Sequence, residues 1–303
     1  MKPNFSQNII ALVWDFDKTL IPYYMQQPLF QHYNVDDLQF WTEVNQLPAF
    51  YRKQGVTMSP DTAYLNHILS YVKQGKFAGL SNNKLREMGG GLDFFPGLPE
   101  FFHELSNTTQ LEEDYAKFDI KVEHYIVSTG LTEVIRGSIL SDLVKGIWGC
   151  EFIEENGQID SIAYQIDNTT KTRALFEINK GVNIHPDDIS VNQSMTDADR
   201  RVPFENMIYI ADGPSDIPAF SVVRKNNGKG FAVYNKDNIK SFKQAKQLLE
   251  DNRVDMFGEA DYRSGTITNL WLREQIQTIA DRIVSDKKSK LRETRESVPH
   301  HLN

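Results

Sequence analysis

Short apolar runs that alternate with helical patterns constrain the fold of this 303-residue chain more than any other feature of its sequence. The predicted strands span residues 9–14, 122–127, 207–211 and 230–234. The predicted helices span residues 131–143, 171–180, 214–224, 236–251 and 266–285. Such alternation is typical of an α/β protein whose largely parallel sheet is covered by helices. Apolar runs at 150–153 and 159–166 flank Asn156-Gly157, a strong turn signal, and predict a hairpin.

One long segment, residues 22–91, interrupts this alternation. It contains one helical pattern after another, at residues 28–32, 35–45, 48–54 and 60–74. Three consecutive glycines, 89–91, close the segment and predict a flexible hinge. We therefore expect a helical domain over residues 22–91, inserted into a core made of residues 1–21 and 92–303.

The composition narrows the class of partner. The net charge is −8, and the one basic run, residues 287–292, is interpreted as a solvated helix end or a poorly ordered tail. This charge pattern argues against nucleic acid as a partner. No run approaches the roughly 18 apolar residues of a membrane span. Cys150 is the single cysteine, which favours a reducing compartment, and we expect a cytoplasmic protein.

Two aspartates, Asp15 and Asp17, follow the first predicted strand directly. Side chains alternate along a strand, so both carboxylates project to one side if the extended geometry continues. Two such charges repel by several kcal/mol near a protein surface. A metal ion, a proton on one carboxylate, or exposure to water would relieve that repulsion.

The second predicted strand runs into Ser128, Thr129 and Gly130. Hydroxyl groups and backbone N–H groups at a strand-to-helix junction are suited to bind an anion. The alternative is an ordinary helix start, since serine and threonine are common N-cap residues.

A lysine opens the helix predicted at 171–180. Lys171 lies in the first turn of this helix, and Thr169 or Thr170, just before it in the sequence, can serve as the N-cap. A cation there opposes the helix macrodipole by a few tenths of a kcal/mol. Local rules are often broken at functional sites, although an exposed helical lysine is the commoner case.

A second acidic pair follows the strand predicted at 207–211. Asp212 ends the strand, Gly213 permits a turn, and Pro214 suits the first position of a helix. Asp216 falls in that first helical turn, where the dipole favours a carboxylate, so a purely structural role is credible for it.

All four groups lie at the carboxyl ends of predicted strands, the edge where open parallel sheets bind ligands. Neighbouring carboxylates, a hydroxyl and a lysine can together bind a divalent cation and a phosphate. Mg²⁺ suits such oxygen ligands.

The ordered set of Asp15-Phe16-Asp17-Lys18-Thr19, Ser128, Lys171 and the Asp212–Asp216 segment resembles the haloacid dehalogenase-like hydrolase superfamily, specifically its phosphatases. The resemblance covers residues from about 5 to 235, and the last seventy residues carry no motif. It implies a Rossmann-like parallel core with an all-helical cap inserted after the first strand. It leaves the substrate open, although Tyr23 and Tyr24 are candidate substrate contacts.

The resemblance also implies roles for individual residues. Asp15 would attack phosphorus and form an aspartyl-phosphate, and Asp17 would act as general acid and then as general base. Thr19 would help to orient Asp17. Ser128 and Lys171 would bind phosphoryl oxygens.

The remaining implied roles concern the anion and the metal. Thr129 and Gly130 complete the predicted phosphate-binding set. The implied Mg²⁺ ligands are Asp15, the backbone carbonyl of Asp17, and Asp212, with Asp216 acting directly or through water.

The sequence thus predicts a Mg²⁺-dependent phosphomonoester hydrolase acting on a small phosphorylated metabolite. A phosphomutase would keep the same motifs. A domain that has lost catalysis and binds a phosphorylated ligand or a protein is a further alternative. A dehalogenase has no need of the acid at Asp17, so the presence of Asp17 with Lys171 and the second acidic pair argues against that activity.

Overall fold

The computed structural model of the protein describes residues 5–110, 112–182 and 189–296. Its centre is a seven-stranded sheet in the order β4-β3-β2-β1-β5-β6-β7. All neighbouring strands are parallel except β3 and β4, which form an antiparallel hairpin. The strands are β1 (Ile9–Trp14), β2 (Lys121–Leu131), β3 (Gly146–Glu155), β4 (Gln158–Tyr164), β5 (Met207–Ala211), β6 (Lys229–Tyr234) and β7 (Met256–Glu259). The predicted α/β class with a mostly parallel sheet is confirmed.

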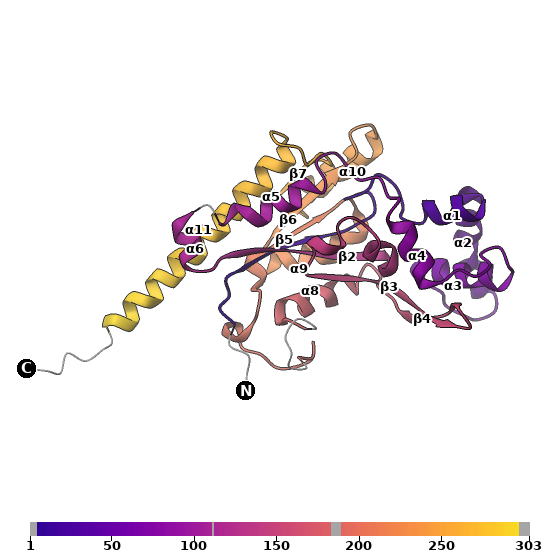
Figure 1. Ribbon diagram of the computed structural model, residues 1–303, viewed down its shortest axis with the longest axis horizontal. Coiled ribbons are helices and arrows are strands. Elements are labelled where there is room, and N and C mark those ends of the chain that lie inside the picture. The colour runs from indigo at the N-terminus through magenta and orange to yellow at the C-terminus, as the bar shows by residue number, and fades with distance from the viewer. Residues whose placement is uncertain (1–4, 111, 183–188, 297–303) are drawn as a thin grey trace, which may run out of the picture.

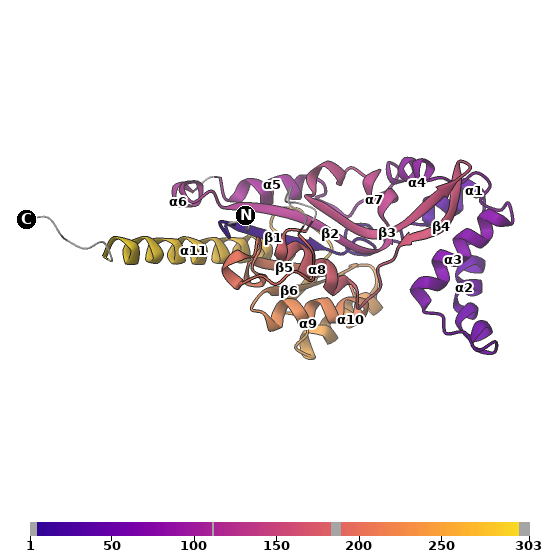
Figure 2. The same cartoon turned by 90° about the horizontal axis from the view of Figure 1, so that it is seen from below.

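Strand β1 is central and completely buried, because each face of it is covered by a different apolar layer. Ile10, Leu12 and Trp14 pack on the side of α5 (Glu100–Thr108) and α11 (Ile267–Glu296). The alternate residues of β1 pack on the opposite side, which is covered by α8 (Lys171–Lys180), α9 (Ile217–Lys225) and α10 (Ile239–Glu250). The resulting three-layer arrangement is visible in Figure 2.

The register of the sheet places the predicted site residues along one edge. Trp14, the last residue of β1, pairs with Ile126 of β2 and Ile210 of β5. Asp15, Ser128 and Asp212 each follow these paired residues by one or two positions.

Four helices between β1 and α5 form one end of the molecule in Figure 1. They are α1 (Gln27–Tyr33), α2 (Asp37–Arg52), α3 (Pro60–Lys73) and α4 (Asn82–Gly89). The two helices predicted at 35–45 and 48–54 are one continuous helix, α2, with Pro48 inside it. The division of the chain into a core and a cap domain stays a prediction.

Gly89, the first of the three glycines predicted as a hinge, lies at a close contact between two segments of backbone. A Cβ atom on Gly89 would lie 2.0 Å from the carbonyl oxygen of Val134, and one on Gly137 would lie 1.7 Å from that of Arg86. Gly89 and Gly137 therefore allow α4 to pack backbone against backbone on α7 (Thr132–Arg136) and the residue that follows it.

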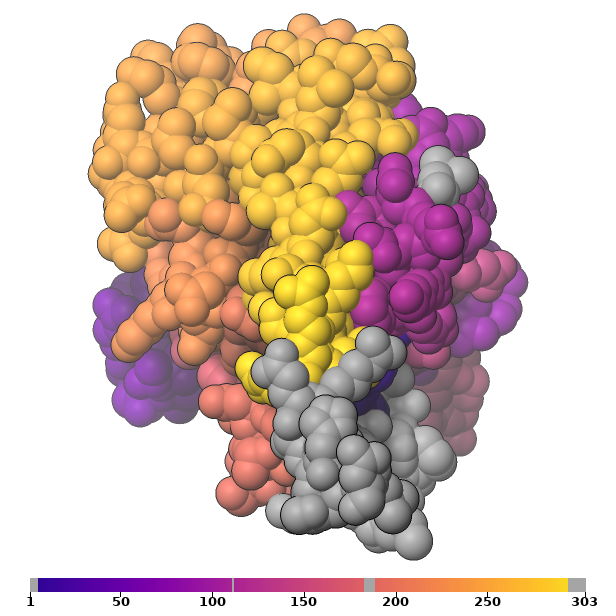
Figure 3. Space-filling model, turned by 90° about the vertical axis from the view of Figure 1, so that its left-hand side faces the viewer, coloured from indigo at the N-terminus to yellow at the C-terminus, as the bar shows by residue number. Residues whose placement is uncertain are grey.

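The helix predicted over 131–143 was wrong in extent. It is limited to α7, because β2 continues to Leu131 and Gly137 follows the helix as its C-cap. Of the two interpretations of residues 287–292, the helix end is confirmed: α11 continues to Glu296, and Lys288 pairs with Asp114 of α6 (Glu113–Lys117) at 2.7 Å. Figure 3 shows α11 in yellow beside the magenta residues of α5 and α6. Within the described ranges, no helix is both long and apolar enough to cross a membrane.

Candidate active site

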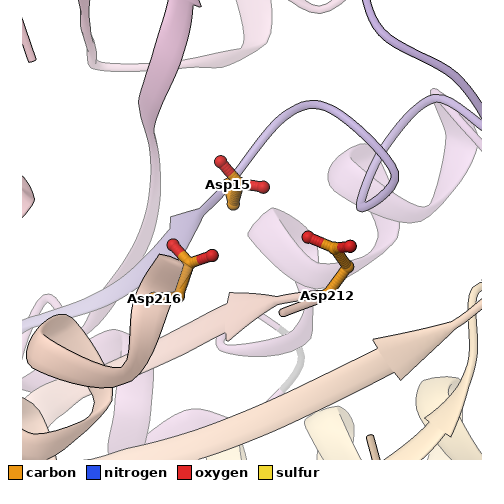
Figure 4. A group of neighbouring side chains, drawn as sticks. All are labelled: Asp15, Asp212 and Asp216. Atoms are coloured by element: carbon orange, nitrogen blue, oxygen red, sulfur yellow. The ribbon is translucent and has the colours of Figure 1, made fainter. Parts of the chain in front are cut away.

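The side chains predicted from the ends of β1, β2 and β5 converge at one edge of the sheet. Asp15 directly follows β1, and Ser128 lies in the last part of β2. Asp212 directly follows β5, and Lys171 is the first residue of α8. Figure 4 shows the carboxylates of Asp15, Asp212 and Asp216 turned toward a common space.

A buried lysine joins two of these carboxylates. The Nζ atom of Lys171 lies 2.7 Å from Oδ1 of Asp15 and 2.6 Å from Oδ1 of Asp216. All three side chains are buried, with 1% of Lys171 exposed. Burial lowers the pKa of Lys171, but the charges of Asp15 and Asp216 outweigh it and raise the pKa above its ordinary value. Lys171 is therefore a cation at every physiological pH.

Three carboxylates form a compact acidic group. One oxygen each from Asp15, Asp212 and Asp216 lies within 4.8 Å of the others. Burial raises the pKa of Asp15 to about 6, with Lys171 opposing the shift and Asp216 adding to it. Burial and the charges of Asp15 and Asp216 raise the pKa of Asp212 to about 8. Carboxylate oxygens this close and this poorly hydrated fit a hard divalent cation such as Mg²⁺, which would relieve their repulsion.

The carboxylate of Asp216 is held by more than the lysine. The hydroxyl of Tyr209 on β5 donates to its Oδ1 at 2.6 Å. The hydroxyl of Ser215 donates to its Oδ2 at 2.9 Å. Asp216 is thus fixed in orientation, and through it so is Lys171.

The second aspartate of the first motif has a different environment. Asp17 is half-buried, and its Oδ1 accepts a hydrogen bond from the backbone N–H of Met25 at 2.9 Å. Burial and the charge of Asp15 raise its pKa well above the ordinary value. A carboxyl group with a raised pKa can carry a proton near neutral pH, as a general acid must.

The hydroxyl of Thr19, which was expected to help orient Asp17, makes its hydrogen bond to a different aspartate. The hydroxyl of Thr19 donates to Oδ2 of Asp15 at 3.3 Å. The chain turns after Asp17, because Lys18 has a φ of 60° and Leu20 N–H bonds to the carbonyl of Phe16. This turn brings the side chain of Thr19 back to Asp15, four positions earlier in the sequence.

The segment predicted to bind phosphate is buried and tightly folded. Ser128 and Gly130 are buried, and the N–H of Gly130 donates to Oγ of Ser128 at 2.9 Å. The register between β2 and β3 shifts between Val127 and Leu131, so the backbone leaves regular pairing at Ser128. Ser128–Gly130 is therefore an irregular stretch inside β2, and the helix starts only after Leu131.

Comparison with known proteins identifies relatives in sequence and in structure. The chain is 39% identical over 292 residues to an uncharacterized protein of Borreliella burgdorferi, a match that covers 90% of this chain and 98% of that protein. The two proteins belong to one family. No model of a known protein family matches the chain.

Three of the similar solved structures align with TM-scores of 0.50 or more. A probable phosphoserine phosphatase from Vibrio cholerae aligns with a TM-score of 0.54 at 15% identity, covering 93% of this chain and 68% of that one. A phospho-aspartyl intermediate analogue of phosphoserine phosphatase aligns at 0.50 and 13% identity, covering 82% and 93%. A protein from Salmonella enterica serovar Typhi, described as a HAD family hydrolase, aligns with a TM-score of 0.50 at 14% identity, covering 75% of this chain and 62% of that one.

The chain has the haloacid dehalogenase-like fold. These identities are low, so the likeness concerns the arrangement of the backbone. The predicted resemblance is confirmed at this level. In this fold, Asp15 and Asp212 lie at the carboxyl edge of the sheet, directly after β1 and β5, and Lys171 lies beside Asp15 at the start of α8.

Four residues around this site of the haloacid dehalogenase-like fold were not found by sequence reasoning. They are Met25, Tyr64, Tyr209 and Tyr262. The hydroxyl of Tyr262, from the region that carries no motif, donates to the carbonyl of Thr19 at 2.6 Å, and its ring packs edge-on against Trp14. Tyr209 lies within the strand predicted at 207–211, and its place in that apolar run indicates a buried side chain. Tyr64 and Tyr262 have no spacing signal, because they reach the site from distant segments. Met25 follows Asp17 by eight positions, but no periodic pattern marks it.

The two tyrosines considered as substrate contacts differ. Tyr23 accepts a hydrogen bond from the backbone N–H of Asp93 at 2.7 Å, which ties it to the segment that follows α4. Tyr24 is 47% exposed, and the ammonium of Lys18 lies 3.8 Å from the centre of its ring. Tyr24 therefore contacts Lys18, the residue that directly follows Asp17 in the sequence.

Proposed function

We propose that the protein is a Mg²⁺-dependent phosphomonoester hydrolase that acts on a small phosphorylated metabolite through an aspartyl-phosphate. The observation that carries this proposal is the convergence of Asp15, Lys171 and Asp212, which lie far apart in the sequence, within a few ångströms at the carboxyl edge of the sheet. The haloacid dehalogenase-like fold and the phosphatase names of structurally similar proteins support the reaction class.

In the first step, a carboxylate oxygen of Asp15 forms a bond to phosphorus while the bond between phosphorus and the leaving oxygen breaks. Asp17 gives its proton to that oxygen, so the alcohol leaves neutral. In the second step, Asp17 accepts a proton from water as the water oxygen attacks phosphorus. The bond to Asp15 then breaks, which releases inorganic phosphate and restores the Asp15 carboxylate.

Charge neutralisation is assigned to the residues around Asp15. Lys171 offsets the negative charge that Asp15 and the phosphoryl group would otherwise bring together, and Ser128 donates to a phosphoryl oxygen. Mg²⁺, held by Asp15, the backbone carbonyl of Asp17 and Asp212, would supply further positive charge next to the phosphoryl oxygens. Thr129 and Gly130 complete the proposed phosphate site.

Helices α1 to α4, within the proposed cap of residues 22–91, would close over the substrate and exclude water. The enzyme would work in the cytoplasm, where its single, buried thiol stays reduced. We assign it neither nucleic acid nor a membrane as a partner.

The test is release of phosphate from p-nitrophenyl phosphate and from a panel of phosphorylated amino acids, sugars and nucleotides. Activity should require Mg²⁺, stop on chelation with EDTA, and fall at least about a thousandfold in Asp15→Asn, since that variant lacks the nucleophile. Asp114→Asn, which changes an exposed carboxylate of α6, is the matched control and should keep full activity. Turnover that survives Asp15→Asn would remove the proposed mechanism.

A further inference from the structure

We propose that Tyr64 of α3 is a positioning residue that sets the direction of the Ser128 hydroxyl for the phosphoryl group. This inference rests on the proposed function, because it takes Ser128 as a phosphoryl ligand. Tyr64 acts through the backbone and touches neither the substrate nor Asp15.

The connection runs through one rigid peptide unit. The hydroxyl of Tyr64 donates to the carbonyl oxygen of Thr129 at 2.6 Å. That carbonyl and the N–H of Gly130 belong to the same planar peptide group, so fixing one fixes the other. The Gly130 N–H donates to Oγ of Ser128 at 2.9 Å. Tyr64 therefore controls the hydrogen bond that orients the Ser128 side chain.

This arrangement prepares Ser128 as a donor. Its oxygen already accepts from Gly130, so its hydroxyl hydrogen is directed away from that N–H group. A hydroxyl held in this way can donate to a phosphoryl oxygen without first reorienting, which is how preorganised sites stabilise charge. A looser Gly130 would leave the hydroxyl to rotate.

Tyr64 is suited to a fixed role. Only 6% of its surface is exposed, and its ring packs at 6.1 Å from Trp41 of α2. Burial raises the pKa of Tyr64 well above 10, so the hydroxyl remains a donor at every working pH. The thiol of Cys150, a weak donor, also lies 3.4 Å from the Thr129 carbonyl oxygen. Tyr64→Phe would therefore remove the stronger of these two side-chain donors.

The origin of Tyr64 has a consequence for the whole site. Tyr64 belongs to α3, within residues 22–91, whereas Ser128, Thr129 and Gly130 belong to β2 of the sheet. The hydroxyl of Thr62, in the first turn of the same helix, also reaches the sheet side of the molecule, 2.9 Å from the side-chain oxygen of Gln165. The oriented state of Ser128 thus requires α3 to be packed in place.

The experiment compares two tyrosines of the same helix. Tyr64→Phe removes the hydroxyl that reaches Thr129. Tyr71→Phe is the matched control, because Tyr71 is also buried on α3 but its hydroxyl donates to Glu43 at 2.8 Å. For wild type and both variants we would measure the dissociation constant of inorganic phosphate by calorimetry with Mg²⁺, the thermal midpoint, and KM and kcat.

We expect Tyr64→Phe to weaken phosphate binding about tenfold, the scale of one lost hydrogen bond, and to raise KM similarly. Tyr71→Phe should leave the dissociation constant of phosphate and KM unchanged. It should lower the thermal midpoint by about as much as Tyr64→Phe does. Equal phosphate affinity in wild type and Tyr64→Phe, or an equal loss in both variants, would overturn the inference.

The same measurements separate this inference from the proposed function. A wild-type protein that binds phosphate but hydrolyses no ester would contradict the hydrolase, and the phosphate affinities would still decide the role of Tyr64. A wild-type protein that binds no phosphate would overturn both.

Discussion

The ammonium group of Lys171 lies 2.7 Å from the carboxylate of Asp15 and 2.6 Å from that of Asp216, and all three side chains are buried. A buried charge without a partner is far more costly than an exposed one, so each member of this trio depends on the others. The trio is both the electrostatic centre of the proposed site and a point on which folding depends.

Lys171→Met should therefore affect both activity and stability. We expect phosphatase activity to fall at least about a hundredfold, because the lost cation would stabilise charge in the transition state. The free energy of unfolding without Mg²⁺ should fall by about 3–5 kcal/mol, the usual effect of breaking a buried pair. Lys121→Met, which removes an exposed lysine paired with Asp119, should change stability by less than about 1 kcal/mol. Urea unfolding of the two variants checks this, and equal losses would contradict it.

A side chain at Gly130 should displace the end of the Met25 side chain, because that end occupies the space beside Gly130. A Cβ on Gly130 would lie 2.2 Å from Cε and 2.5 Å from Sδ of Met25. Met25 also donates its backbone N–H to Asp17, so its displacement should disturb the proposed general acid. We expect Gly130→Ala to lower kcat/KM about tenfold or more.

A second substitution tests that cause. Met25→Ala in the Gly130→Ala background should restore part of the lost kcat/KM, because it removes the clash. Steady-state kinetics of both singles and the double give the coupling between the positions. Additive effects would rule out a clash between Met25 and Gly130 as the reason.

Stability should decrease in acid partly through His124. Its Nδ1 lies 3.1 Å from Nε1 of Trp14, its Nε2 lies 3.1 Å from the carbonyl of Phe102, and burial lowers its pKa to about 3. Below pH 6.5 the unfolded chain binds a proton at this histidine and the folded chain does not, so the unfolded state is favoured. Through His124, the free energy of unfolding therefore falls progressively from pH 6.5 down to about 3, by up to about 1.4 kcal/mol per pH unit.

The matched measurement is the urea midpoint of wild type and His124→Phe at pH 7.5, 6 and 5. His124→Phe should be less stable at pH 7.5, since Trp14 loses its acceptor, and the gap between the two proteins should narrow as the pH falls. A constant gap would mean that His124 does not titrate between folded and unfolded states as argued.

Neighbouring glycines at the end of α4 should differ in their response to alanine. Gly89→Ala would press a Cβ against the backbone of Val134 and Gly137, which can give way only by moving α4 from α7. We expect a loss of about 1–3 kcal/mol, as for other overpacked sites. Gly90 has a negative φ and no contact closer than 3.4 Å at its Cβ position, so Gly90→Ala should be near neutral. Chemical denaturation of both variants decides, and equal effects would show that α4 is not packed this tightly.

The sequence by itself determined the frame of the sheet and the residues at its edge. The strands predicted at 9–14 and 207–211 have those bounds in the structure, because an uninterrupted apolar run buried on both faces leaves little freedom in where a strand lies. Asn156 and Gly157 both take positive φ at the turn between β3 and β4, as an Asn-Gly hairpin predicts. Once two such strands are parallel neighbours, Asp15 and Asp212 must lie near each other.

The tertiary structure decided everything that depends on distant segments meeting. The hydroxyl of Thr19 contacts Asp15 because of a tight turn that no periodicity encodes. Tyr64 reaches Thr129 across 65 positions of the sequence, and Tyr262 reaches Thr19 across 243. A hydrogen bond between elements needs a donor and an acceptor within about 3 Å of each other and suitably aligned. Sequence spacing reveals periodicity along one element, but it does not reveal which residues of different elements come together.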